Sequence, residues 1–232
     1  MAARRKQHSV IIETASDVRR GVMVLRRKCP HMRRLHDLTG DPPLRRFAPG
    51  FEGLSRIVVG QQLSTASAGA IWTRTAAAVQ PFSPRVMLKR SDTELRAAGL
   101  SRAKIKTLRA IAAAIDGNEL DLAGLSIAGD EVVRVALTGV SGIGPWTADI
   151  YLMFCLGRAD SWAPGDLALQ LAAQSALGLE TRPGPGDLED IAERWRPWRA
   201  IAACLLWAYY AHNTTGPAKT ANRNRGGNKK SA

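Results

Sequence analysis

The chain has 232 residues, of which 45% are hydrophobic, and this is enough to bury a sizeable core in one or two domains. No apolar run reaches the length of a transmembrane helix, which predicts that the protein has no membrane partner. The opening Met-Ala-Ala-Arg-Arg-Lys is not followed by the apolar stretch of a secretory signal, so we expect a cytoplasmic protein.

The positive charge is concentrated at the two ends of the sequence. The formal net charge is +13; residues 1–35 hold ten Lys and Arg against two acidic residues, and residues 216–232 hold five against none. Residues 36–215 hold 18 basic and 18 acidic residues and are formally neutral. A basic chain indicates a polyanionic partner, but flexible basic tails attract polyanions without specificity. The charge therefore favours nucleic acid without locating a binding site.

The cysteines and histidines show no metal-ligand spacing. The three cysteines, Cys29, Cys155 and Cys204, lie far apart, and no Cys-x-x-Cys pair occurs. We expect three reduced thiols. Three scattered cysteines cannot build a four-cysteine iron–sulfur cluster, so none is predicted.

Helical periodicity begins near the N-terminus. Ser16 or Thr14 can cap a basic amphipathic helix that runs to about Lys28, and a short helix is expected from His31 to Leu38. From Phe51 onward the pattern is helical almost without interruption. Its first apolar stripe consists of Phe51, Leu54, Ile57, Val58 and Gln61.

The next helix is predicted from Ser64 to Val79, and Pro81 and Pro84 break the pattern after it. Ser91 with Glu94 forms a capping-box pattern for a short helix that ends near Gly99. A longer helix should then run from about Leu100 to Ile115. Residues 120–125 are expected to form a loop or a short turn.

Residues 130–149 are the most informative stretch. Asp130 can cap a short helix over residues 131–137, and Pro145 suits the first position of a second helix. Three glycines in the turn between them supply the positive φ that a tight reversal requires: Gly139, Gly142 and Gly144. Backbone N–H groups at a helix N-terminus bind anions, so this turn is a candidate phosphate site.

A second stretch of interest begins at Asp166, which can cap an apolar helix over residues 167–177 that Gly178 ends. Two last helices are predicted over residues 187–194 and 198–212. No segment alternates at period two for long enough to be a strand. We therefore predict an all-α protein with a disordered basic tail at 213–232.

The string Val-Ser-Gly-Ile-Gly-Pro-Trp-Thr-Ala-Asp at 140–149 resembles the helix-hairpin-helix motif of the HhH-GPD DNA glycosylases, and Asp166 falls where that family keeps its catalytic aspartate. Two further segments, 51–71 with its Gly-Gln-Gln-Leu-Ser core and 192–207, resemble the DNA-3-methyladenine glycosylase II branch. The resemblance covers most of residues 16–212.

This resemblance implies a fold of two helical lobes with the active cleft between them. One lobe would contain residues 1–50 and 166–212. The other would contain the inserted residues 51–165 and would end in the helix-hairpin-helix motif.

The resemblance also implies site residues. Asp166 would stabilise the positive charge that develops on the deoxyribose when the N-glycosidic bond breaks. Trp146 occupies the position of the Schiff-base lysine in the family's bifunctional lyases, which predicts a monofunctional enzyme. Trp146 and Trp207 could line a pocket for cationic alkylated purines. Ile150 departs from the family pattern, because a bacterial enzyme of the DNA-3-methyladenine glycosylase II branch has tyrosine there.

Two other sets of residues follow from the resemblance alone. Gln62, with Gln61 as the alternative, would fill the gap that a flipped base leaves in the duplex. Backbone carbonyls in the hairpin would hold a monovalent cation, Na⁺ or K⁺, and would come from Thr138, Val140 and Ile143.

The sequence thus predicts a monomeric glycosylase that removes 3-methyladenine-type purines from double-stranded DNA and works on the bacterial nucleoid. One alternative is a glycosylase for deaminated or oxidised bases, since Ile150 alters the pocket. Another is a non-catalytic DNA-binding protein that uses the hairpin only as a phosphate clamp.

Overall fold

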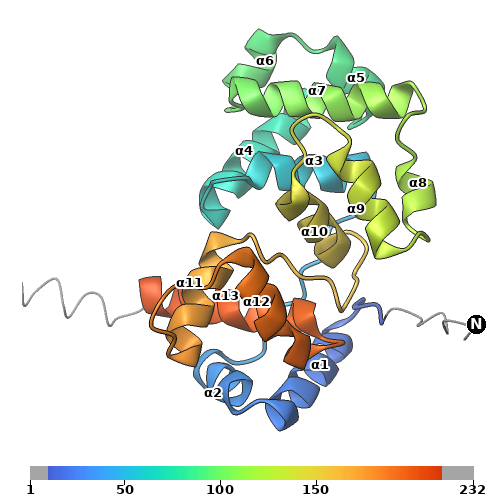
Figure 1. Cartoon of the computed structure of the whole chain (residues 1–232). Helices are drawn as coiled ribbons and strands as arrows, with labels where there is room; N and C mark the ends of the chain where they lie inside the picture. Colours follow the sequence, from blue (N-terminus) through green and yellow to red (C-terminus); the bar gives the residue numbers. More distant parts are fainter. Residues whose placement is uncertain (1–9, 216–232) are drawn as a thin grey trace, which may run out of the picture. The chain divides into compact units, whose positions relative to one another are not determined.

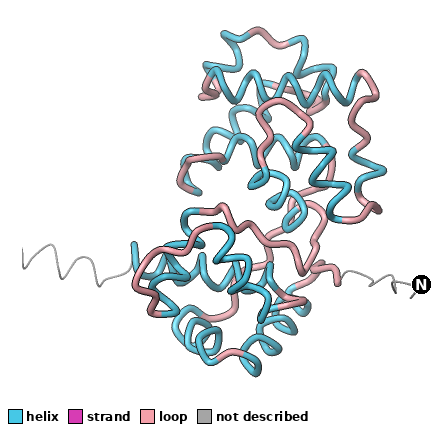
Figure 2. Tube along the Cα trace, in the orientation of Figure 1, coloured by secondary structure: helices cyan, strands magenta, loops and turns pink. Residues whose placement is uncertain are grey.

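The computed structural model describes residues 10–215. Within this range the chain forms helices joined by loops and no strand (Figures 1 and 2), with one isolated bridge between Ile11 and Arg158. The prediction of an all-α protein is confirmed. No helix within residues 10–215 is both long and apolar enough to cross a bilayer.

The end of the described chain differs slightly from the prediction. The last helix continues to Thr215 rather than stopping at His212. The rest of the predicted basic tail, residues 216–232, lies outside the described residues.

The described residues divide into two compact units. The terminal unit contains the chain up to Leu44 and from Arg158 onward, and the central unit contains Arg45–Gly157. The expected boundaries, 50/51 and 165/166, both lie later in the chain than the boundaries in the structure. Backbone hydrogen bonds explain the difference. The Phe47 N–H donates to the Phe154 carbonyl at 2.9 Å and ties residues before 51 to the central unit, whereas the Ala159 N–H donates to the Val10 carbonyl at 2.9 Å within the terminal unit.

In the terminal unit, the long C-terminal helix is packed against α1, α2 and α11 (Figure 1). Thr14, one of the two predicted caps, caps α1 in a capping box with Asp17, and Gly178 ends α11 as predicted, with a φ of +68°. The helices of this unit are α1 (Ala15–Lys28), α2 (Pro30–Thr39), α11 (Leu167–Leu177), α12 (Pro185–Ala192), the 3₁₀ turn η1 (Glu193–Trp195) and α13 (Arg199–Thr215).

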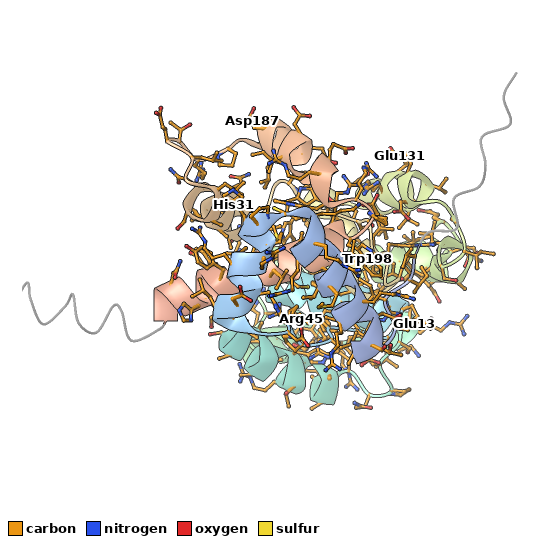
Figure 3. All side chains as sticks on the ribbon, turned by 90° about the horizontal axis from the view of Figure 1, so that it is seen from below. Glu13, His31, Arg45, Glu131, Asp187 and Trp198 are labelled. Atoms are coloured by element: carbon orange, nitrogen blue, oxygen red, sulfur yellow. The ribbon has the colours of Figure 1, made fainter. Side chains whose placement is uncertain are left out.

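Trp198 lies against α1 at a point where that helix has no side chain (Figure 3). A Cβ atom added to Gly21 would lie 2.6 Å from Cε3 of Trp198 and 2.8 Å from Cγ1 of Ile201. The guanidinium of Arg20 covers the same indole ring, 5.5 Å from its centroid. Gly21 is therefore required for the close approach of α1 and α13.

In the central unit, α7 packs against α3, α5 and α6, and α3 packs in turn against α4 and α10. The core is formed by fully buried aliphatic side chains such as Leu54, Val58, Leu108 and Ile111. The helices of this unit are α3 (Phe51–Gly60), α4 (Thr65–Ala78), α5 (Pro84–Lys89), α6 (Asp92–Ala97), α7 (Arg102–Asp116), α8 (Leu122–Leu125), α9 (Asp130–Thr138) and α10 (Pro145–Phe154).

Helix α4 ends at Ala78, as the break predicted at Pro81 and Pro84 requires, whereas the cap predicted at Asp130 needs correction. Pro84 is also the first residue of α5, where its fixed φ suits a helix and its missing N–H needs no partner. Asp130 is not a cap: Gly129 occupies that position, and Asp130 lies in the first turn of α9, where its charge complements the helix dipole.

The packing at Gly21 predicts opposite effects for two glycine substitutions in helices. Gly21→Ala should lower the free energy of unfolding by about 1–3 kcal/mol, because the new methyl group overlaps Trp198. Gly69→Ala in α4, where no atom lies within 4 Å of the added Cβ, should raise it by up to about 1 kcal/mol through helix propensity. Urea denaturation measures both, and a stabilising Gly21→Ala would contradict the packing.

Candidate functional site

The turn between α9 and α10 depends on one of its three glycines. Gly142 has a φ of +88°, and a Cβ at this position would overlap the side chain of Thr107 on α7. Gly139 and Gly144 have φ values of −67° and −98°, which any residue can adopt. The expectation that all three supply positive φ is therefore wrong for two of them.

Gly144 has a different part in the turn, since it leaves the N-terminus of α10 open. No atom lies within 4 Å of the position where its Cβ would be. The N–H groups of Thr147 and Ala148 donate to the Gly144 carbonyl at 3.0 and 3.2 Å, and the Ile143 N–H donates to the Val140 carbonyl at 3.0 Å. The amides of Gly142 and Gly144 are thus the candidate phosphate donors, and that role remains a prediction.

An ion pair that sequence reasoning missed joins the two helices of the hairpin. The Asp149 carboxylate, which is only 6% exposed, accepts a hydrogen bond of 2.8 Å from Nε of Arg134. Burial alone would lower the pKa of the Arg134 guanidinium, but its bond to Asp149 reverses the shift and raises the pKa. The ion pair between Arg134 and Asp149 therefore joins α9 to α10.

The predicted pocket residues of the hairpin lie on α10. Trp146 is half-buried in the first turn, and Ile150 follows four residues later on the same helical face, with 6% of its surface exposed. Both residues belong to the central unit, whereas Trp207 belongs to the terminal unit. That Trp146 and Trp207 line one pocket stays a prediction.

The two predicted intercalation residues follow the end of α3 and differ in their surroundings. Gln61 is half-buried, and its Nε2 donates to Oγ1 of Thr147 on α10 at 2.9 Å. Gln62 is exposed and has a φ of +58°. The structure thus connects Gln61 to the hairpin and presents Gln62 to solvent.

The carbonyls predicted to hold a monovalent cation lie where α9 ends. Thr138 is the last residue of α9, and Val140 and Ile143 lie in the turn after it. Carbonyl oxygens at a helix C-terminus are hard ligands that suit a cation such as Na⁺ or K⁺. Among residues 10–215, no group of three or more His, Cys, Asp and Glu side chains could hold a metal ion.

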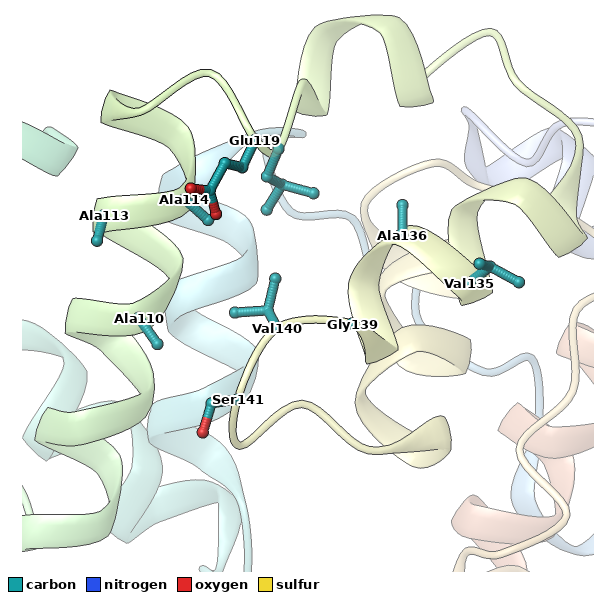
Figure 4. A pocket seen from close by; sticks show the side chains of 10 residues that line it. Ala110, Ala113, Ala114, Glu119, Val135, Ala136, Gly139, Val140 and Ser141 are labelled. Atoms are coloured by element: carbon teal, nitrogen blue, oxygen red, sulfur yellow. The ribbon is translucent and has the colours of Figure 1, made fainter.

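A pocket of about 460 Å³ lies between α7 and the hairpin turn (Figure 4). Alanine and valine side chains form most of its lining, and its one ionisable residue is Glu119. Gly139, Val140 and Ser141 of the hairpin turn also line this pocket.

In the terminal unit, Asp166 and Trp207 are in direct contact. Asp166 is the N-cap of α11, and its Oδ1 accepts hydrogen bonds from the Leu169 N–H at 2.9 Å and from the indole N–H of Trp207 at 3.0 Å. Both side chains are half-buried. The carboxylate therefore has a defined orientation, set by two donors from two helices.

The turn that presents Asp166 is held by side chains that sequence reasoning missed. The buried amide of Gln170 donates to the Pro164 carbonyl at 2.9 Å. Arg199, 6% exposed, donates from Nε to the carbonyl and to Oδ1 of Asp160, both at 3.0 Å, and from Nη1 to Glu189 at 2.6 Å. No local pattern marks Arg199, because Asp160 lies 39 residues away in sequence.

Comparisons with known proteins identify the family of this chain. The family described as HhH-GPD superfamily base excision DNA repair protein matches residues 56–197. A DNA-3-methyladenine glycosylase of Schizosaccharomyces pombe is 30% identical over 167 residues, which span 68% of this chain and 71% of the relative. The chain therefore belongs to the HhH-GPD superfamily of base excision DNA repair proteins.

Solved structures share the fold. A 3-methyladenine DNA glycosylase of S. pombe, in complex with abasic DNA, has a TM-score of 0.76 and 26% identity, and the match covers 85% of this chain and 98% of that one. A DNA-3-methyladenine glycosidase of Bacillus halodurans has a TM-score of 0.68 and 30% identity, and the match covers 82% and 88%.

The hairpin geometry predicts that Gly142 and Gly144 respond differently to alanine. Gly142→Ala should lower the free energy of unfolding by more than about 2 kcal/mol, because a left-handed φ and a clash with Thr107 add together. Gly144→Ala should leave it within about 0.5 kcal/mol. Thermal and urea denaturation measure both, and equal effects would show that the turn differs from the one described.

Proposed function

We propose that this chain is a monofunctional DNA glycosylase that hydrolyses the N-glycosidic bond of alkylated purines of the 3-methyladenine type in double-stranded DNA. The observation that carries this proposal is the Asp166 carboxylate, oriented by the Leu169 amide and the Trp207 indole in a chain of this family. The named relatives are 3-methyladenine glycosylases, which supports the substrate class.

The chemistry requires a negative charge that is already in place. As the bond between base and sugar breaks, positive charge develops at C1′ and the ring oxygen of the deoxyribose. A carboxylate in a fixed position stabilises that charge without reorganising, and it can orient the water that attacks C1′. The two N–H bonds to Oδ1 hold Asp166 in one orientation before substrate binds.

Trp146 supports hydrolysis over the lyase reaction. At this position the bifunctional relatives need a lysine, which forms a Schiff base with the sugar. Lys104, in the same unit, cannot easily replace it, because its ammonium is bonded to the carbonyls of Val59 at 2.7 Å and Gln61 at 3.0 Å. Water is therefore the nucleophile, and the product is an abasic site in an intact strand.

Aromatic side chains suit the proposed substrate. N3- and N7-alkylated purines are formally cationic, so stacking on an indole, that of Trp146 or that of Trp207, would add cation–π attraction and favour them over neutral bases. A cationic base is also a good leaving group and needs no general acid. Ile150 would give the base an aliphatic contact in place of the tyrosine ring.

DNA binding in this proposal uses the hairpin. The amides of Gly142 and Gly144 would bind one phosphate, and the carbonyls of Thr138, Val140 and Ile143 would hold a monovalent cation beside it. Contacts to phosphate place the protein on duplex DNA without reading sequence. The protein would act as a monomer.

A specific observation separates this proposal from a non-catalytic clamp. A clamp needs the hairpin and nothing in the terminal unit, yet two helices of that unit supply donors to one carboxylate. A glycosylase for deaminated or oxidised bases would use the same carboxylate, so substrate tests must distinguish it.

The proposal predicts selective release of alkylated bases without a covalent intermediate. Under single-turnover conditions the protein should release 7-methylguanine and 3-methyladenine from methylated duplex DNA faster than uracil or 8-oxoguanine from matched duplexes. Borohydride should trap no enzyme–DNA adduct, and the strand should break only after alkali opens the abasic site.

Three outcomes would contradict this proposal. Preferential release of uracil or 8-oxoguanine would assign the other substrate class. A trapped adduct would show an amine nucleophile. Binding of DNA with no base release from any duplex would support the clamp.

A further inference from the structure

Lys104 forms its hydrogen bonds at the end of the helix that precedes the candidate intercalating glutamines. Nζ donates to the carbonyls of Val59 and Gln61, at 2.7 and 3.0 Å. The last carbonyls of a helix have no partner within the helix and carry partial negative charge, so an ammonium there is favourable. Lys104 thereby fixes the backbone on both sides of Gly60.

Building on the proposed function, we propose that Lys104 is a positioning residue that holds the turn at residues 60–64 so that Gln62, and not Gln61, enters the duplex where the target base leaves. Lys104 does this from α7, the helix that also supports the hairpin turn. It does not touch the reacting atoms.

Gln61 is already engaged on both its main chain and its side chain. Its carbonyl accepts from Lys104, and its Nε2 donates to the hydroxyl of Thr147, a residue only 2% exposed on α10. Entry of this side chain into DNA would break its bond to Thr147 and leave a buried hydroxyl to find another partner. Gln61 thus connects α3 to the hairpin and is unsuited to intercalate.

Gln62 has the exposure and the backbone that an intercalating residue needs. Its side chain is exposed, and its φ of +58° is uncommon for a residue other than glycine. The residues around it maintain this conformation: the Leu63 N–H donates to the Gly60 carbonyl at 3.3 Å, and Ser64 caps α4. Backbone strain that neighbours maintain is a feature of functional sites.

Helix α7 supports both turns with one face. Lys104 and Thr107 are three residues apart and therefore neighbours on that face. Thr107 lies against Gly142 in the hairpin turn, and Lys104 holds the end of α3. Figure 4 shows α7 beside the hairpin turn, where Ala110 and Ser141 are labelled. The spacing between the candidate phosphate donors and Gln62 is therefore set by one helix.

The test compares Lys104→Met with Lys106→Met, an exposed lysine on the same helix. Each variant is given one 7-methylguanine in a fully paired duplex, or in the same duplex with the lesion in an unpaired bubble. An intercalating residue matters for opening a paired site, and opening needs the least energy when the base is already unpaired. Single-turnover release is measured beside the melting temperature.

Lys104→Met should release the base at least about tenfold more slowly from the paired duplex, but within about threefold of wild type from the bubble. Lys104→Arg should restore part of the loss, and Lys106→Met should match wild type on both substrates. Gln62→Ala should show the same selective loss, and combining it with Lys104→Met should add little, because both changes remove one function.

Several results would overturn this inference. Equal losses on both substrates would show that Lys104 supports the fold or the chemistry. Wild-type release from the paired duplex by a folded Lys104→Met would remove its role. If Lys104→Met does not fold, Gln62→Ala decides whether Gln62 enters the duplex. If Gln61→Ala alone releases the base more slowly from the paired duplex but not from the bubble, Gln61 is the intercalating residue. A wild-type protein that releases no base from either substrate would refute the proposed function itself.

Discussion

The orientation of one carboxylate is the constraint on which the terminal unit depends. Asp166 accepts two N–H bonds through a single oxygen, one from its own helix and one from Trp207 on α13. This arrangement requires α11 and α13 to pack together, and Arg199 and Gln170 to hold the chain that leads to the cap. Catalysis by a fixed charge needs such a frame, because a mobile carboxylate would have to be ordered during the reaction.

The central unit meets a different requirement. It holds the turn between α9 and α10 and the turn at residues 60–64 at a constant spacing. Gly142 can lie against α7 only because it has no side chain, and the end of α3 is held to the same helix by Lys104. The bond from Gln61 to Thr147 then joins the end of α3 to α10 directly. A rigid spacing of this kind suits a regular polymer such as duplex DNA, whose phosphates and base steps recur at fixed distances.

Sequence predicted the features that depend on neighbouring residues. The caps and stops follow from local patterns: the structure selects Thr14 from the two candidate caps Ser16 and Thr14, and it confirms the cap at Asp166 and the stop at Gly178. The sequence predicts positive φ for all three glycines of the turn because glycine permits that conformation. Gly142 alone adopts it, and it alone lies against α7. The partners of Arg199 and Lys104 lie far away in sequence, so no spacing rule could identify them.

Asp166→Asn isolates the contribution of the Asp166 charge to base release. An asparagine oxygen can still cap α11 and accept from Trp207, so only the negative charge is lost. Single-turnover release of 3-methyladenine should fall by about a hundredfold or more, with melting temperature and DNA affinity preserved. Asp121→Asn, the same change at the cap of α8, is the matched control and should keep full activity. Near-normal release by a folded Asp166→Asn would contradict the account.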